Sequence, residues 1–163
     1  MTQSAGFLVF KRNGASVEVL LAHPGGPIWG HKDFWSIPKG ELDEDEDHLA
    51  AARREFEEEI GLPVPEGKLL DLGSAKGSGG KVNFVWAVEG DIDLSQFHCN
   101  TFTMEWPPRS GRMQEYPEND RAGWFTLPVG RAKVFENQAV FLDRLAKELG
   151  LELAPPTEQQ SLL

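Results

Sequence analysis

Apolar residues occur along the chain in short blocks that are separated by turn-forming residues. Blocks of this length, rich in Val, Ile, Phe and Trp, predict strands. The Asn13-Gly14 pair is typical of a hairpin turn, and the glycine-rich segment 77–80 predicts a second turn. The expected strands and extended segments are residues 6–10, 17–23, 34–37, 69–74, 82–89, 101–106 and 122–127.

Two segments have the periodicity of an amphipathic helix. The first runs from about Asp47, the end of a polar and acidic segment, to Ile60, and Leu49, Phe56 and Ile60 fall on one side of it. Gly61 suits the position just past its C-terminus. The second helix is expected over residues 131–149. Its predicted buried face consists of Val134, Phe135, Phe141, Leu142, Leu145 and Leu149.

The remaining segments predict loops. Residues 23–31 are rich in Gly, Pro and Trp, and residues 107–120 form a long polar segment of the kind that is often functional. Asp43 and Glu46, which precede the first helix, have the spacing of a capping box. Residues 151–163 predict a flexible C-terminal tail.

The composition is that of one globular domain. The chain has 163 residues, of which 40% are hydrophobic and 26% charged. Strands interrupted by one helix and closed by another predict a single α/β domain over residues 1–150, with a mixed β-sheet.

The lone Cys99 cannot form an internal disulfide, which favours a reducing compartment, and we expect a cytoplasmic protein. No apolar run is long enough for a membrane span, and the N-terminus does not resemble a signal peptide, so we expect no membrane partner.

The net charge of −10 changes this picture in two ways. A uniformly acidic surface repels nucleic acid, so we expect no nucleic-acid partner. Clustered carboxylates can also form a metal site, and a bound cation would then reverse the local sign of the charge.

Three glutamates near the end of the first helix form such a cluster. Glu55, Glu58 and Glu59 have i, i+3, i+4 spacing, which places them on one helix face. They repel one another and lie near the negative end of the helix dipole. A solvated acidic face is the alternative interpretation. A divalent cation would relieve both conflicts, and oxygen ligands suit Mg²⁺ or Mn²⁺.

A calcium loop is a rival interpretation of the acidic segment before the helix. Asp43, Asp45 and Asp47 match the first three ligand positions of an EF-hand loop. The sixth position is then His48 instead of Gly, and the twelfth is Arg54 instead of Glu. The spacing therefore argues against a calcium loop.

The segment 40–62 resembles the Nudix box at every fixed position. The matching residues are Gly40, Glu46, Arg54, Glu55, Glu58, Glu59 and Gly61, with apolar Phe56 and Leu62 between and after them. The resemblance implies a Nudix hydrolase, which cleaves nucleoside diphosphates linked to another moiety. It also implies a Nudix-type α/β/α sandwich in which the box forms a loop, a helix and a second loop.

The resemblance assigns roles to the box residues. It implies that Glu55, Glu58 and Glu59 bind Mg²⁺ or Mn²⁺, that the Gly40 carbonyl adds a ligand, and that Glu55 and Glu58 take part in catalysis. Bound cations would neutralise the pyrophosphate and lower the pKa of the attacking water. The structural residues that it implies are Glu46 and Arg54, which pair, and Gly61.

A further catalytic carboxylate is expected in a loop after the box. Glu118 stands six residues before Trp124, which matches the family's local pattern, and Glu115 and Glu105 are the next candidates. A solvated loop acid is the alternative interpretation of Glu118.

The residues before the box bear on the substrate. Segment 35–40, Trp-Ser-Ile-Pro-Lys-Gly, resembles the dinucleoside-polyphosphate-hydrolase-like branch, although Glu41 stands where that branch often has His. The insertion 107–117 does not match that branch. Lys39 and Lys81 are candidate phosphate contacts, with a solvated surface charge as the alternative.

Aromatic residues could stack on a nucleobase. Trp35 and Phe84 are the candidates, and core packing is the alternative for both. We therefore expect a small-molecule nucleotide substrate, most simply a dinucleoside polyphosphate, and a monomer or homodimer. Two other functions stay open: a sanitising pyrophosphohydrolase of oxidised or non-canonical nucleoside triphosphates, and a catalytically silent nucleotide-binding sensor.

Overall fold

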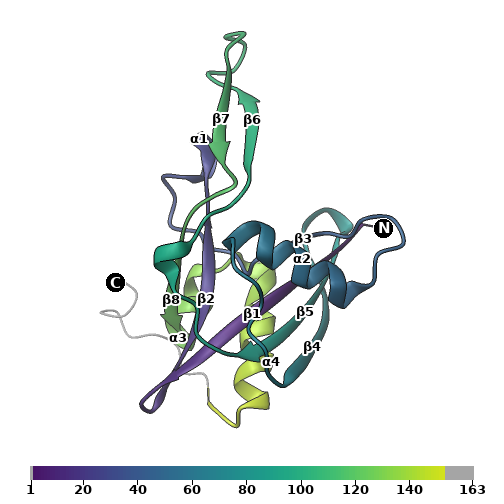
Figure 1. The fold of residues 1–163 in the computed structure, drawn as a ribbon, viewed down its shortest axis with the longest axis vertical. Helices are drawn as coiled ribbons and strands as arrows, with labels where there is room; N and C mark the ends of the chain where they lie inside the picture. The colour runs from purple at the N-terminus through teal and green to yellow at the C-terminus, as the bar shows by residue number, and fades with distance from the viewer. Residues whose placement is uncertain (1, 153–163) are drawn as a thin grey trace.

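A mixed β-sheet with helices on both faces forms the body of the protein (Figure 1). The structure is a computed structural model that describes residues 2–152, so most of the expected C-terminal tail lies outside the described residues. The sheet order is β4-β5-β1-β2-β8, and β3 also pairs with β1. β1 and β5 run parallel, and the other neighbours run antiparallel. The strands are β1 (Gln3–Asn13), β2 (Ser16–Pro24), β3 (Lys39–Glu41), β4 (Leu69–Lys76), β5 (Val82–Glu89) and β8 (Asn119–Thr126).

The central strand β1 is apolar on both sides because both faces of the sheet are covered. Helix α2 (His48–Ile60) covers one face, where its Phe56 and Ile60 pack with Phe7 of β1. Helices α3 (Leu127–Lys133) and α4 (Ala139–Glu148) cover the other face, where Leu142 packs with Leu8. The expected α/β/α sandwich with a mixed sheet is confirmed.

The single helix expected over residues 131–149 is wrong. The chain forms α3 and α4 instead, with a short 3-10 turn, η3 (Glu136–Gln138), between them. Val134 is extended because the segment pairs with Trp35: the Trp35 amide donates to the Lys133 carbonyl, and the Phe135 amide donates to the Trp35 carbonyl. These two hydrogen bonds take the backbone out of the helical conformation.

Helix α2 begins directly after Asp47, as the periodicity predicts, and the capping-box pair of Asp43 and Glu46 lies before its start. Its N-cap is Asp47, whose carboxylate accepts from the Ala50 amide at 3.1 Å. Glu46 does accept from the Asp43 amide, at 2.9 Å, but this contact closes a turn before the helix. Gly61 ends the helix with φ 85°, a left-handed conformation that glycine adopts without strain.

The loop expected over residues 107–120 is also wrong in part. Strand β7 (Met113–Pro117) pairs with β6 (Thr101–Glu105), and β8 starts at Asn119 instead of 122. The prolines and glycine of this segment lie mainly at the tip of the resulting hairpin, which projects from the body (Figure 1). The other short elements are α1 (Gly26–Trp29), which lies in the loop expected at 23–31, η1 (Ser78–Gly80) and η2 (Leu94–Gln96).

None of the helices within residues 2–152 combines the length and the apolar character that a bilayer crossing requires.

Candidate active site

The last two turns of α2 carry the three glutamates of the cluster, and two of them, Glu55 and Glu59, lie against β3. The Glu55 side chain is 15% exposed and the Glu58 side chain 42% exposed. The Glu59 carboxylate accepts a hydrogen bond from the Lys39 amide at 3.1 Å. This hydrogen bond joins the end of α2 to the start of β3.

Gly40 is required by the position of Glu55. A Cβ atom at residue 40 would overlap the Glu55 carboxylate. Only glycine leaves room for the carboxylate at this position of β3, so Gly40 and Glu55 are close neighbours.

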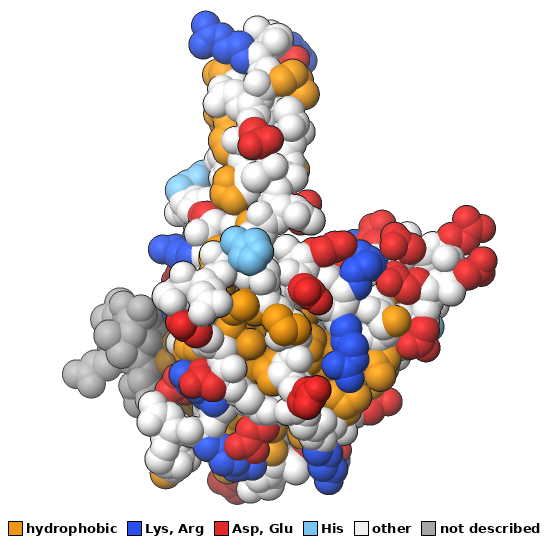
Figure 2. All heavy atoms as spheres, viewed as in Figure 1, with side chains coloured by type: hydrophobic (Ala, Val, Ile, Leu, Met, Phe, Trp, Pro, Cys, Tyr) orange, Lys and Arg blue, Asp and Glu red, His pale blue; other side chains and the backbone are white. Residues whose placement is uncertain are grey.

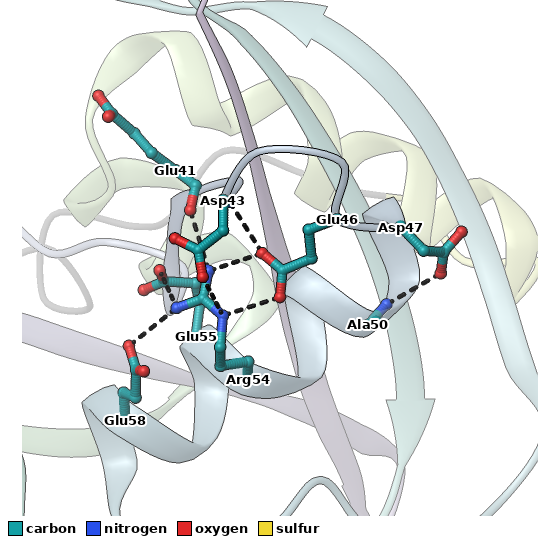
Figure 3. Close-up of polar contacts among 8 residues, drawn as sticks. All are labelled: Glu41, Asp43, Glu46, Asp47, Ala50, Arg54, Glu55 and Glu58. Atoms are coloured by element: carbon teal, nitrogen blue, oxygen red, sulfur yellow. Dashed lines mark hydrogen bonds and ion pairs between the residues drawn. The ribbon is translucent and has the colours of Figure 1, made fainter.

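Arg54 joins the loop before α2 to the glutamate cluster (Figure 3). Its Nε and Nη2 atoms donate to the two oxygens of Glu46 at 2.8 and 2.9 Å, a bidentate pair. Nη2 also donates to the Glu41 carbonyl at 3.1 Å, and Nη1 donates to Glu55 at 2.9 Å and Glu58 at 3.1 Å. The hydrogen bonds from Arg54 lower the pKa of Glu46 to about 2. Arg54 thus fixes the loop and orients two of the three glutamates.

The negative charges of the glutamate cluster are not fully balanced by neighbouring positive charges. Burial, followed by the charge of Glu55, raises the pKa of Glu59 to about 8. Burial also raises the pKa of Glu55, although Arg54 acts in the opposite direction. Clustered carboxylates and a backbone carbonyl are ligands that suit a divalent cation such as Mg²⁺ or Mn²⁺, so the residues fit such an ion by donor type and by charge.

The glutamates do not converge on a common point in the structure. Among residues 2–152, no three carboxylate, imidazole or thiol groups are gathered as a ready-made metal site. The reason is visible in Figure 3, where Glu55 and Glu58 both turn toward one nitrogen of Arg54. A cation would compete with that nitrogen for both carboxylates.

Glu118 interacts electrostatically with the cluster from a separate element. It lies between β7 and β8, where its amide donates to the Asn100 carbonyl at 3.0 Å. Burial, and then the charge of Glu58, raises its pKa. The charge of Glu118 in turn contributes to the raised pKa of Glu55 and of Glu59. The other two candidates, on the hairpin strands, are Glu105 in β6 and Glu115 in β7.

Lys39 and Lys81 line one cavity of about 430 Å³ beside the cluster. Burial, and then the charge of Lys81, lowers the pKa of Lys39. Lys81 forms an ion pair with Glu41 at 3.4 Å. Two lysines that line one cavity would bind a polyanion such as a phosphate chain.

The structure does not bring the two expected stacking residues to this cavity. Trp35 is 6% exposed and packs edge-on against His23 and Phe125 in the core. Phe84 packs against His48, with ring centroids 4.3 Å apart. Neither ring lines the space beside Lys39.

Two other aromatic residues line the cavity, and neither is one of the two expected stacking residues. They are Trp29, which is 39% exposed, and Phe135, whose ring lies edge-on to Trp29 at 5.3 Å. Phe34 stacks on Phe135 at 5.6 Å. The available signal was Trp29 itself, a large aromatic residue in a Gly- and Pro-rich segment that the sequence predicts as a loop and not as part of the core.

Residues 2–145 match the sequence profile of the NUDIX domain. A segment of 58 residues is 43% identical to an RNA pyrophosphohydrolase of Caulobacter vibrioides, from strains NA1000/CB15N and ATCC 19089. This match covers 31% of the chain and 34% of the relative, so the chain matches about a third of the length of these curated relatives.

Solved structures share the fold at low identity. A Caenorhabditis elegans Ap4A hydrolase in a binary complex has a TM-score of 0.61 and 18% identity, over 92% of this chain and 98% of that one. The NUDIX domain of Shewanella oneidensis NrtR, complexed with ADP ribose, has a TM-score of 0.61 and 16% identity, over 90% and 87%. The Mycobacterium smegmatis Nudix hydrolase RenU has a TM-score of 0.59 and 18% identity, over 94% and 89%. The fold, the box residues and the profile match together show that the chain belongs to the Nudix family.

Proposed function

We propose that the protein is a divalent-metal-dependent pyrophosphohydrolase of nucleotides, and that its preferred substrates are dinucleoside polyphosphates or related nucleotides. The observation that supports this most is the position of the glutamate cluster beside a cavity with two lysines and two aromatic rings. Such a reaction needs three kinds of group: carboxylates that bind cations, lysines that bind phosphates, and aromatic rings that stack on a base.

In this proposal Glu55, Glu58, Glu59 and the Gly40 carbonyl hold Mg²⁺ or Mn²⁺. When bound, the cation supplies neutralisation of the phosphate oxygens and a lower pKa for a nearby water molecule. Arg54 keeps the carboxylates oriented through its hydrogen bonds to Glu55 and Glu58.

The remaining groups act on the water and on the substrate. Glu118 accepts the proton of the attacking water, and its raised pKa makes it a better base than a solvated glutamate. Lys39 and Lys81 bind the phosphates, and Trp29 and Phe135 hold the base by stacking.

A product-resolved assay with Mg²⁺ or Mn²⁺ tests the proposal. We expect a four-phosphate dinucleotide to give a nucleoside triphosphate and a monophosphate. Glu58→Gln should lower turnover by about a hundredfold or more, because it removes a charged ligand. The matched control is Glu57→Gln, which changes an exposed neighbour on another side of α2.

Other outcomes would replace parts of the proposal. Pyrophosphate and a monophosphate released from oxidised nucleoside triphosphates, without cleavage of the dinucleotide, would indicate the sanitising function. Release of pyrophosphate from an RNA would indicate the activity for which the Caulobacter relative is named. Nucleotide binding without turnover across the panel would indicate a sensor.

A further inference from the structure

The hairpin of residues 101–117, here called the arm, has little contact with the rest of residues 2–152. Strands β6 and β7 pair only with each other within the described residues, in the register Thr101↔Pro117 to Glu105↔Met113. Figure 1 shows the arm projecting from the body. An isolated two-stranded hairpin is marginally stable in water, and its unpaired edges can pair with another chain. The arm therefore has the features of a segment that binds a partner.

One face of the arm is apolar. Phe102, Met104 and Tyr116 share this face, and the rings of Phe102 and Tyr116 lie 5.9 Å apart. The body reaches the base of the arm at α1, where Gly26 lies against the Phe102 ring. On the opposite face, near the tip, Met113 is 64% exposed.

The tip of the arm is basic and well ordered by its own hydrogen bonds. Arg109 and Arg112 are exposed, and neither belongs to an ion pair among residues 2–152. The Trp106 amide donates to the Arg112 carbonyl at 2.9 Å, and the Arg109 amide donates to Glu105 at 2.7 Å. These contacts hold the turn, so the two guanidinium groups are presented at the far end of a defined structure.

The rest of the chain carries the complementary charge. The arm contains two arginines and two glutamates, so the net charge of −10 lies on the other residues. Figure 2 shows blue side chains at the tip of the arm and red side chains gathered on an edge of the body. The loop of residues 41–47 contributes to the acidic surface, with the side chain of Glu41 63% exposed and that of Asp43 75% exposed.

We propose that the arm binds a second copy of this chain, with the arginine tip on the partner's acidic loop of residues 41–47. A two-fold axis would bring two basic tips to two acidic loops, so each contact forms twice in a closed dimer. The apolar face of the arm would pack against protein surface. A nucleic acid is the less suitable partner because the body of the chain repels a polyanion. This proposal does not depend on the hydrolase activity.

Sedimentation velocity of the full chain, over a wide range of protein concentration at low and high salt, tests the proposal. We expect a monomer–dimer equilibrium that shifts toward monomer at high salt, because exposed ion pairs are screened. Arg109→Glu with Arg112→Glu should weaken the dimer about tenfold or more. The matched control is Lys68→Glu with Lys147→Glu, which changes the net charge equally at two exposed lysines in the body.

A compensating variant tests the acidic loop itself. Glu44→Lys with Asp45→Asn should restore dimerisation to the arginine variant. Asn is chosen because Asp45 has φ 62°, a conformation that Asn tolerates.

A wild-type chain that stays monomeric at every concentration would overturn the proposal, as would an arginine variant that dimerises as well as the lysine control. Failure of the compensating variant would also contradict it. Binding of an RNA oligonucleotide by monomers, lost in the arginine variant, would assign the arm to nucleic acid instead.

Discussion

The Glu55 carboxylate occupies the space that a side chain at Gly40 would fill. A residue of β3 and a residue of α2 are therefore matched by shape, and both belong to the same proposed ligand set. Glycine is therefore needed at position 40 to keep Glu55 in place, and not only to form a turn.

Gly40→Ala should displace Glu55 and weaken binding of Mn²⁺ at least about tenfold. The physical reason is the overlap between the new methyl group and the carboxylate. Isothermal titration of the purified variant with Mn²⁺ measures the effect. Gly123→Ala is the control, since a Cβ there meets neighbours only at ordinary contact distances of 3.4 Å or more. Equal Mn²⁺ affinity in both variants would refute the shape argument.

The pair between Arg54 and Glu46 should stabilise the fold in a defined pH range. Arg54 lowers the pKa of Glu46 to about 2, so the stabilisation is present above the ordinary glutamate pKa and is lost as the pH falls toward 2. Chemical unfolding from neutral to acid pH should show wild type more stable than Glu46→Gln at neutral pH, with the difference vanishing near pH 2. A difference that does not change over this range would contradict the prediction.

Glu59 should give the opposite pH dependence in the metal-free protein. Its pKa is raised to about 8, so the folded state binds a proton more tightly than the unfolded state. The resulting stabilisation is complete below the ordinary glutamate pKa and is lost as the pH rises through 8. Unfolding in a chelator should therefore show stability falling between pH 5 and 8, and Glu59→Gln should flatten this decline. An unchanged decline in the variant would assign it to other groups.

Trp29 and Trp35 should differ sharply when each is replaced by alanine. Trp29→Ala removes a partly exposed ring that lines the cavity. The variant should lose about 1–3 kcal/mol of stacking with the base, which raises KM. Its free energy of unfolding should change little. Trp35→Ala removes a core side chain and should lower the free energy of unfolding by about 3–5 kcal/mol. Steady-state kinetics and urea unfolding separate the two effects. A KM change in a stable Trp35→Ala protein, with none in Trp29→Ala, would reverse the assignment.

The sequence predicts elements most accurately where the local residue pattern and the tertiary contacts favour the same secondary structure. The periodicity that ends at Ile60, followed by Gly61, predicts the C-terminus of α2 correctly because the helix is amphipathic and glycine adopts the left-handed conformation there. Strand β5 matches its predicted residues, 82–89, because its apolar block is buried in the sheet.

The wrong predictions arise where tertiary contacts override the local sequence pattern. The helix expected at 131–149 is broken because the backbone at residues 133–135 pairs with Trp35, a contact between residues that are far apart in sequence. Strand β6 lies within the extended segment predicted at 101–106, but β7 lacks an apolar block, so only its pairing with β6 reveals it. The aromatic residues of the cavity could not be separated from core residues, because periodicity places Phe135 on a buried helix face that the structure does not form.

The most direct test of the proposed metal site is anomalous diffraction from a crystal of the full chain grown with Mn²⁺. We expect an anomalous peak within coordination distance of the Glu55, Glu58 or Glu59 carboxylates, with the Arg54 contacts to Glu55 and Glu58 lengthened. The absence of a peak at saturating Mn²⁺, or a peak held only by other residues while Arg54 keeps both contacts, would contradict it.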